Sequence, residues 1–394
     1  MRSKLKKIIF ILIILLLMFL LSFKINDIIK GNLKKENDTK INIEKENDKE
    51  EVLYPIKNSF SLVATGDALL HDAVYLSQKS NNGSYDFTSV FSHIKDYINK
   101  FDIKYVNQET VLGDPPYSSY PLFNTPTAWG DAMIDAGFNL FSLATNHSYD
   151  KFTKGALRTL EYWQSKENIG YAGMNSSEDR KYHIEEVNGI TYGFLSYTEH
   201  LNGLKLPNGY EYLVDVYNYE QAKTDIEYLK ENVDVVIVAM HWGIEYISEP
   251  NEAQRTIANE LADLDVDLII GSHPHWLQPI DYIDDTLVIY SLGNFISNQL
   301  SIMNNAYYTD SVAVGALVSL DINKLTYEDY DDIVIDNIVV ELIYSYRGPD
   351  RKYYVIPFSK MNETYNKNYV KIYEKHKERM TMYNDKIFVN PLGQ

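Results

Sequence analysis

Two histidines that bracket a proline stand out in the stretch DLIIGSHPHWLQP, residues 267–279. The chain has nine histidines in all, and His273 and His275 come directly after an apolar run. Because Pro274 disfavours helical backbone at the residue before it, we expect an extended segment whose alternate side chains point the same way. Two imidazoles with a shared direction suit a transition-metal site. A turn with two solvent-facing histidines is the alternative.

Four other apolar runs also lead into residues of metal-ligand type. These runs are followed by Gly66-Asp67, Asn107-Gln108-Glu109, Thr145-Asn146-His147 and His241. Ligands of α/β sheets bind outside the carboxyl ends of the strands, so five strand ends are expected to meet at one edge. The candidate metal ligands are therefore Asp67, Glu109, Asn146, His241, His273 and His275. Each has an ordinary alternative by itself, such as a turn, an N-cap or a buried histidine, but a shared site explains all five ends together.

The residue types indicate which metals and which reactions such a site would support. The chain has no cysteine, which excludes thiolate ligands, disulfides and cysteine nucleophiles. Imidazole, carboxylate and amide ligands favour Mn²⁺, Zn²⁺, Fe or Mg²⁺ over copper. Six candidates exceed the four ligands of one structural zinc. We therefore predict a pair of divalent ions that share Asp67 or Glu109 and promote hydrolysis of a phosphate ester or an amide.

Four further residues are candidates for roles beside the metal. His147 follows the candidate ligand Asn146 and could bond a substrate oxygen or protonate a leaving group. Glu245 comes four residues after His241 and could orient a water or a ligand. Asn107 and Trp276 are predicted to contact substrate, with core packing as the alternative for Trp276. The remaining histidines include His93, His183, His200 and His376, which we expect to be structural or surface residues.

Strands and helices alternate along the chain. Strands are predicted over residues 60–65, 103–106, 138–144, 191–197, 234–240, 267–270 and 286–292, and helices over 89–101, 153–166, 218–232 and 252–264. This alternation predicts an α/β fold. Residues 301–394 contain three long β-like runs, at 312–322, 332–346 and 353–358. We expect them to complete the same body; a separate small domain is the alternative.

The N-terminal segment has the pattern of a membrane anchor. Residues 1–7 are basic, and residues 8–23 form an uninterrupted apolar run of about 24 Å as a helix. The positive charge predicts a cytoplasmic N-terminus, a single membrane span and an extracellular main domain. A cleaved signal peptide is the alternative. Residues 29–53 are charged and poor in aromatics, which predicts a flexible tether before a folded part that begins near residue 54.

Six motifs in order carry a resemblance to a known family. TGDALLHD, VNQET, ATNHSYD, MHWGIEY, GSHPHWLQPI and YSLGNF span about residues 60–300. Together they resemble the CapA-type capsule synthesis proteins and their poly-γ-glutamate counterparts, a family similar to the calcineurin-like metallophosphoesterases. The resemblance implies a four-layer α/β/β/α sandwich over residues 54–300. It also implies ligand roles for the six candidates above and a catalytic-acid role for His147.

The same resemblance implies a function in making or exporting an anionic surface polymer such as poly-γ-glutamate, together with membrane-bound polymer synthase subunits. Two positions depart from the broader metallophosphoesterases. Leu69 stands at the histidine of their Asp-x-His motif, and Glu109 stands at their bridging aspartate. A surface phosphoesterase acting on small phosphate esters and a non-catalytic export or assembly component are the alternatives.

The net charge restricts the partners. At −18, with no long basic run to offset it, the chain is not expected to bind nucleic acid. Such a chain also repels an anionic polymer, so polymer contact needs a local positive site. A pair of metal ions could supply that site.

Overall fold

The computed structural model describes residues 55–299 and 310–393, which lie in one compact unit, Tyr54–Gln394. The predicted cytoplasmic segment, membrane anchor and tether, residues 1–7, 8–23 and 29–53, lie outside the described residues. Within the part of the chain that the structure describes, no helix is long and apolar enough to cross a bilayer.

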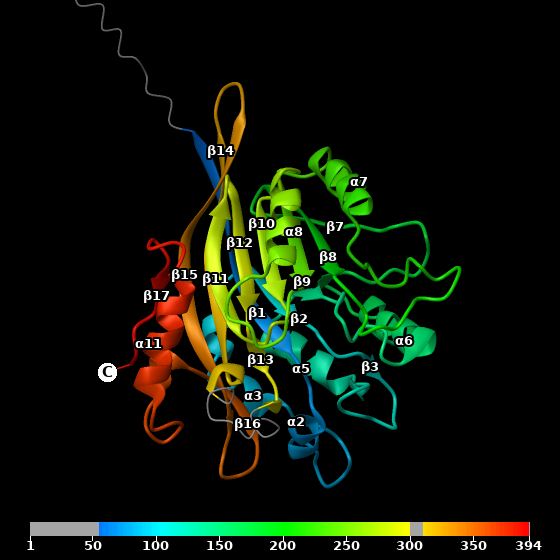
Figure 1. The fold of residues 1–394 in the computed structure, drawn as a ribbon, viewed down its shortest axis with the longest axis vertical. Coiled ribbons are helices and arrows are strands. Elements are labelled where there is room, and N and C mark those ends of the chain that lie inside the picture. Colours follow the sequence, from blue (N-terminus) through cyan, green and yellow to red (C-terminus); the bar gives the residue numbers. More distant parts are fainter. Residues whose placement is uncertain (1–54, 300–309, 394) are drawn as a thin grey trace, which may run out of the picture. The chain divides into compact units, whose positions relative to one another are not determined.

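Two large β-sheets form the centre of this unit (Figure 1). The first has the order β16-β15-β14-β1-β2-β5-β6, with β13 beside β1 and β17 beside β15. Its strands are β1 (Ile56–Ala68), β2 (Ile103–Asn107), β5 (Leu140–Ser142), β6 (Gly170–Ala172), β13 (Asn294–Ile296), β14 (Val314–Thr326), β15 (Asp331–Arg347), β16 (Tyr353–Pro357) and β17 (Phe388–Val389). β1, β2, β5 and β6 are mutually parallel, so their carboxyl ends share one edge.

The second sheet has the order β11-β12-β10-β9-β8-β7. Its strands are β7 (His183–Val187), β8 (Ile190–Thr198), β9 (Val235–His241), β10 (Leu268–Ser272), β11 (Leu277–Ile283) and β12 (Thr286–Leu292). β8, β9, β10 and β12 are parallel. A small separate pair joins β3 (Leu112–Gly113) to β4 (Thr125–Pro126).

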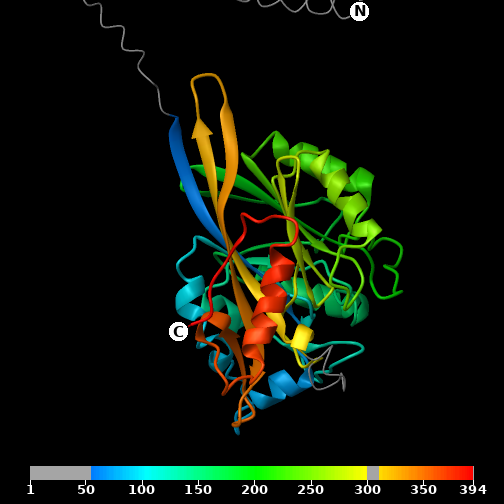
Figure 2. The ribbon, with the colours of Figure 1, turned by 60° about the vertical axis from the view of Figure 1, so that its left-hand side comes forward.

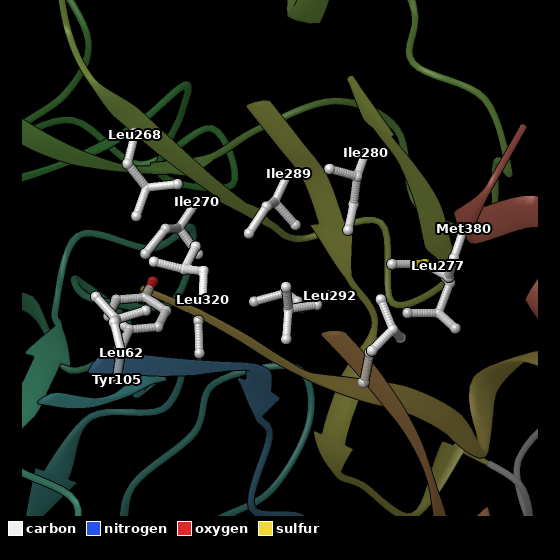
Figure 3. Packing of buried hydrophobic residues seen from close by; sticks show 14 of the residues in the cluster. Leu62, Tyr105, Leu268, Ile270, Leu277, Ile280, Ile289, Leu292, Leu320 and Met380 are labelled. Atoms are coloured by element: carbon white, nitrogen blue, oxygen red, sulfur yellow. The ribbon is translucent and has the colours of Figure 1, made fainter. Parts of the chain in front are cut away.

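Side-chain alternation explains how the two sheets pack. In β9, Val235, Ile237 and Ala239 belong to the core between the sheets, whereas Val236, Val238 and Met240 belong to the core under the helices. Successive strand residues point to opposite faces, and a strand buried on both faces is therefore apolar throughout. Figure 3 shows the inner core, where Leu62 and Tyr105 of one sheet face Leu268 and Ile270 of the other.

Helices cover both outer faces. The helical segments are α2 (Asp72–Ser77), α3 (Thr88–Phe91), α4 (Lys95–Ile98), α5 (Ala128–Ala136), α6 (Phe152–Gln164), α7 (Tyr219–Lys230), α8 (Glu252–Ala262), the short 3₁₀ segment η1 (Phe358–Lys360) and α11 (Tyr369–Met380). Trp129 of α5 and Trp163 of α6 pack on the first sheet, and Ile226 of α7 and Leu261 of α8 pack on the second. The predicted four-layer α/β/β/α sandwich is therefore confirmed.

Most predicted elements are present, with three differences. The single helix predicted over residues 89–101 is two short helices, α3 and α4, and the strand predicted over 138–144 covers only Leu140–Ser142. Helix α11 lies within the C-terminal part, for which only strands were predicted. The long C-terminal strands are present, and β14 pairs antiparallel with β1 from Ile56 to Thr65, so they extend the first sheet.

Candidate metal centre

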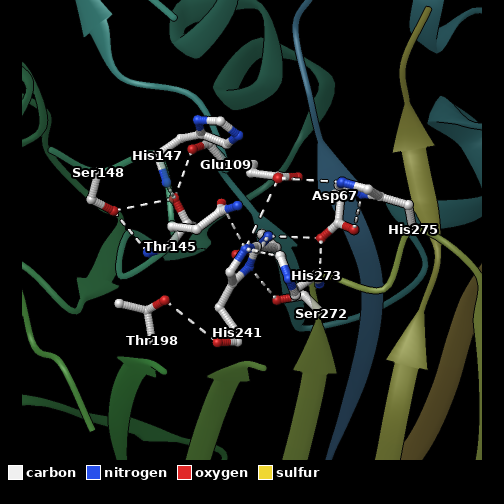
Figure 4. Close-up of polar contacts among 12 residues, drawn as sticks. Asp67, Glu109, Thr145, His147, Ser148, Thr198, His241, Ser272, His273 and His275 are labelled. Carbon is white, nitrogen blue, oxygen red and sulfur yellow. Dashed lines mark hydrogen bonds and ion pairs between the residues drawn. The ribbon is translucent and has the colours of Figure 1, made fainter. Parts of the chain in front are cut away.

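The carboxyl ends of five strands, β1, β2, β5, β9 and β10, bring the candidate ligands together. Asp67 lies at the end of β1 in register with Asn107 of β2, and His241 ends β9 in register with Ser272 of β10. Glu109 follows β2, and His273 and His275 follow β10. Figure 4 shows these side chains converging from the two sheets. The convergence arises because both sheets present the ends of parallel strands at the same edge.

Five side chains form two groups of three that could each hold a metal ion. In one, Asp67, Glu109 and His275 place their ligand atoms within 4.8 Å of one another; in the other, Glu109, His241 and His273 do so. His275 Nδ1 lies 2.9 Å from Asp67 Oδ2, and His275 Nε2 lies 3.8 Å from Glu109 Oε1. The distance from His241 Nε2 to the same Glu109 oxygen is 3.9 Å. Glu109 thus belongs to both groups.

Glu109 carries the chemical indication of a cation. Its side chain is buried, and neither carboxylate oxygen accepts a hydrogen bond from any residue that the structure describes. Burial raises the pKa of Glu109 well above its ordinary value. An isolated buried carboxylate is costly unless a donor or a metal compensates it. The donor set around it, made of imidazole and carboxylate groups, fits a divalent metal.

The protonation states of the histidines are also those expected for a metal site. Burial lowers the pKa of His241 and of His273 well below the ordinary value, so both rings are neutral and offer a lone pair. Burial alone would lower the pKa of His275 too, but the Glu109 and Asp67 carboxylates outweigh it and raise that pKa to about 9. Without metal, His275 therefore holds a proton at the position between two carboxylates that a cation would take.

The two asparagines lie against these ligands. Asn146 Oδ1 is 3.0 Å from His241 Nε2, and Asn146 Nδ2 donates to Asn202 Oδ1 at 3.3 Å. Asn107 Nδ2 donates to Asp67 Oδ1 at 2.9 Å and lies 3.3 Å from His241 Nδ1. Asn107 is fully buried. Its position between two candidate ligands suits holding them in place, whereas the sequence interpretation gave it a substrate contact.

His147 stands beside the ligands with a partner that the sequence analysis missed. Its Nδ1 lies 2.8 Å from Oδ2 of Asp150, which is fully buried and also accepts the backbone N–H of Phe123 at 2.7 Å. The carboxylate fixes the ring so that Nε2 is the atom left for other contacts. The spacing of Asp150 in NHSYD, three residues after His147, was the available signal.

The loops after β9 and β10 hold the remaining predicted residues, Glu245 and Trp276. Glu245 is exposed, and Tyr246 donates its backbone N–H to Pro274 O at 2.8 Å with its ring 5.9 Å from that of His275. Trp276 is 3% exposed. Only a small edge of the indole is therefore accessible to a substrate. The burial of Trp276 agrees better with the alternative, core packing.

The backbone of the His-Pro-His stretch differs from the prediction of an extended segment. His273 has φ 95° and His275 has φ 57°, so both lie in the left-handed region. The chain turns sharply here because it leaves β10 and returns as β11, antiparallel to β12. The two rings lie 6.0 Å apart and serve different ligand groups. Such strained backbone is often found at functional sites.

A close approach of two strands holds Asp67. A Cβ on Gly66 would lie 1.9 Å from Gly293 O, and the Asp67 backbone N–H donates to that same oxygen at 2.9 Å. Only glycine fits at residue 66 for this reason. The motifs TGD and SLGNF therefore meet in space and set the position of the carboxylate.

Two further histidines lie near the site. His200, expected to be structural or a surface residue, packs its ring 5.3 Å from that of His273, and a cleft of about 680 Å³ begins at it. His71 is buried and touches Phe123, whose other neighbour is His147. His71 stands outside both ligand groups, in agreement with the departure from Asp-x-His noted in the sequence.

Comparison with known proteins identifies the family of this chain. Residues 61–299, more than half of the chain, match the model of the family described as bacterial capsule synthesis protein PGA_cap. The chain belongs to this family. All six candidate ligands fall within the matched residues.

Two curated relatives are also similar. The chain is 32% identical over 175 residues to the PGA biosynthesis protein CapA of Bacillus subtilis (strain 168), covering 42% of this chain and 44% of that protein. It is 31% identical over 175 residues to the capsule biosynthesis protein CapA of Bacillus anthracis, covering 43% and 42%. The alignments thus span less than half the length of either relative.

Solved structures show more distant likeness. A hypothetical protein from Thermus thermophilus gives a TM-score of 0.41 at 13% identity, covering 70% of this chain and 98% of that one. The NAD nucleotidase of Haemophilus influenzae gives 0.42 at 14% identity, covering 86% and 65%.

Proposed function

We propose that this member of the capsule synthesis family is a membrane-anchored extracellular protein of capsule or poly-γ-glutamate biosynthesis or export, with a metal-dependent hydrolytic site. The observation that carries the hydrolytic part is Glu109, a buried carboxylate without a hydrogen-bond donor among the described residues, shared by two ligand groups. Two groups that share one carboxylate suit a pair of ions, and such pairs serve hydrolysis of phosphate esters and amides.

Each candidate residue has a role in this proposal. Asp67, Glu109 and His275 would hold one ion, and Glu109, His241 and His273, with the nearby Asn146, would hold the other. Mn²⁺, Zn²⁺, Fe or Mg²⁺ in these positions would polarise the scissile group and activate a water.

The chain's own groups would bind substrate and move protons. His147, oriented by Asp150, would give a proton from Nε2 to the leaving group. Glu245, at the exposed end of the loop after β9, would orient a water or a ligand. The cleft lined by His200, whose ring packs on that of His273, would leave room for substrate near one ligand.

The cellular placement is also part of the proposal. Basic residues before the apolar run 8–23 support a cytoplasmic N-terminus and an outward main domain. The relatives named for PGA and capsule biosynthesis support an anionic polymer as the substrate or product, and membrane-bound polymer synthase subunits as partners.

Metal content tests the centre directly. We expect the full chain, purified in detergent and incubated with Mn²⁺ or Zn²⁺, to hold about two equivalents by mass spectrometry. The double change His273→Ala plus His275→Ala removes one ligand from each group and should abolish binding. The matched control is His93→Ala plus His183→Ala, which removes two histidines that lie outside both groups. A wild-type chain that holds no metal would refute the proposal.

Turnover is the second measurement. The metal-loaded chain should release products from poly-γ-glutamate or from a phosphorylated intermediate, and His147→Gln should slow that release by roughly 10²–10⁴-fold with the metal content unchanged. Hydrolysis of small phosphate esters alone would favour a scavenging phosphoesterase. A loaded chain without any turnover would favour the export or assembly function.

A further inference from the structure

Helix α11 carries a line of cations in a chain with a net charge of −18. Lys371, Lys375 and Arg379 follow one another at intervals of four residues, and Lys367 stands one interval earlier, just before the N-cap Asn368. Side chains four apart on a helix lie on one face, separated by about 6 Å along the axis, which applies to Lys371, Lys375 and Arg379; Lys367 lies in the turn before the helix. We call these four cations the basic stripe.

Helix stability does not explain the basic stripe. Like charges four residues apart repel each other on a helix. Lys371 also lies in the first turn, where the helix dipole disfavours a cation, and that turn has no acidic residue. The pKa of Lys375 is lowered, first by partial burial and then by the charge of Arg379, with Asp310 acting in the opposite direction. Glu374 and Glu378 lie at other helical positions, and Asp310, just before β14, is the acidic residue that acts on both Lys371 and Lys375.

One cation of the basic stripe lies close to the residue that follows His275. Helix α11 lies against β11 and β15, at the front of the view in Figure 2. Lys375 Nζ lies 5.9 Å from the centre of the Trp276 ring and donates to Ser311 Oγ at 2.9 Å. Trp276 is the residue directly after His275. One cation of the stripe thus stands beside the chain segment that carries two of the candidate ligands.

We propose that the basic stripe binds an anionic polymer, an extended chain of carboxylates, and guides it to the candidate metal centre. This inference rests on the proposed function in capsule-polymer biosynthesis, and it names the surface that would hold the polymer. A row of cations about 6 Å apart matches a linear polyanion, and it gives a strongly acidic chain the local positive surface that polymer contact requires. A flat anionic bilayer fits less well, because Lys375 in the row is partly buried against Trp276 rather than fully exposed.

The stripe lies outside the part of the chain that matches the family. The match ends at residue 299, and α11 begins at Tyr369. Polymer capture by α11 is therefore an addition to the family's shared region.

Polymer binding by charge-matched variants tests this proposal. The full chain in zwitterionic detergent is titrated into fluorescently labelled poly-γ-glutamate, and anisotropy gives the affinity. The test variant is Lys371→Gln, Lys375→Gln and Arg379→Gln together. The control is Lys57→Gln, Lys79→Gln and Lys154→Gln, which makes the same charge change at exposed lysines on β1, after α2 and on α6. We expect the test variant to bind the polymer about tenfold more weakly than the wild type, and the control to bind nearly as the wild type does. Added salt should strongly weaken polymer binding by the wild type and the control but not by the test variant.

Metal content and thermal unfolding of the same samples separate the possible failures. Equal polymer affinity in the test variant and the control overturns the basic stripe, whatever the metal content. A chain that holds no metal but loses polymer with the test variant keeps the stripe and refutes the hydrolytic centre. If the test variant melts well below the control, the single change Lys371→Gln, at an exposed residue, replaces it, and a wild-type affinity then overturns the proposal.

Discussion

At the scale of single residues, Glu109 connects the structure to chemistry. Its carboxylate is buried among His241, His275 and Asp67, and both candidate ion positions share it. A pair of ions that catalyses hydrolysis needs a shared ligand of this kind. In an ordinary protein core, by contrast, a buried carboxylate is accompanied by a hydrogen-bond donor. A substitution of Glu109 should therefore affect the metal-loaded protein and the metal-free protein differently.

Glu109→Gln should lower metal affinity by at least about tenfold while leaving the metal-free protein as stable as the wild type or more so. The amide keeps the shape but removes a charge that is costly to bury. Calorimetric metal titration and thermal melting in chelator measure the two effects. Glu249→Gln, an exposed carboxylate in the same loop region, is the control. A loss of metal-free stability would show that Glu109 serves the fold rather than the metal.

Asn202 should act on the metal through Asn146. Its Oδ1 accepts from Asn146 Nδ2, which turns the Asn146 oxygen toward His241. Because Asn202 has φ 50°, Asn202→Gly removes the side chain without backbone strain, and Asn202→Asp keeps an acceptor. We expect the glycine variant to lose roughly tenfold in metal affinity and the aspartate variant to keep most of it. Equal affinities in both variants would contradict this role.

Metal binding should release protons. Below a pH of about 9, metal-free His275 is protonated, because Glu109 and Asp67 raise its pKa to about 9. A metal must displace the proton, so apparent affinity should rise with pH up to about 9. Titration calorimetry at pH 7 in buffers of different ionisation enthalpy should detect at least one proton; none would contradict the assignment.

At the scale of elements, the parallel pairing of β1 with β13 sets the position of Asp67. The segments around Gly66 and Gly293 touch through backbone atoms, so any side chain at residue 66 must separate the strands. The position of the candidate ligand Asp67 therefore depends on a backbone contact between two glycine segments.

Gly66→Ala should reduce both stability and metal binding. Its Cβ would lie 1.9 Å from the Gly293 carbonyl oxygen, a backbone atom that cannot move aside alone. We expect a loss of about 1–3 kcal/mol in the free energy of unfolding, measured by denaturant titration. Gly348→Ala is the control, because there the new methyl group meets the movable Asp350 side chain at 2.6 Å. Similar losses of unfolding free energy in both variants would contradict the importance of the strand contact at Gly66.

At the scale of the whole molecule, the C-terminal strands complete the body that holds the site. β14 pairs with β1 over ten residue positions, from Ile56 to Thr65, and the core between the sheets includes Leu320 and Val340. Without these strands β1 would become an edge and one side of the core would face water.

A chain that ends at residue 299, where the family match stops, should therefore fail to fold. We expect rapid proteolysis and loss of near-ultraviolet circular dichroism, compared with a chain that ends at residue 390 and keeps β17. A protease-resistant 299-residue chain that still binds metal would show that the C-terminal part is an independent addition.

The sequence alone predicted much of this protein. Polar residues after apolar runs located six candidate ligands, because the ends of parallel strands meet at one edge whatever the loops between them do. Alternating strand and helix patterns predicted the α/β fold for a similar reason: periodicity depends only on local backbone geometry. The absence of cysteine limited the possible ligands to imidazole, carboxylate and amide groups.

The tertiary structure decided what depends on contacts between distant residues. Three features depend on partners that no spacing rule identifies: Asp150, Asn202 and the strand contact at Gly66. The left-handed backbone of the His-Pro-His turn follows from the return of the chain as β11. Which carboxylate bridges the two groups was open between Asp67 and Glu109 in the sequence. The fold favours Glu109, because only its carboxylate belongs to both ligand groups, at a place that no hydrogen-bond donor of the described chain reaches.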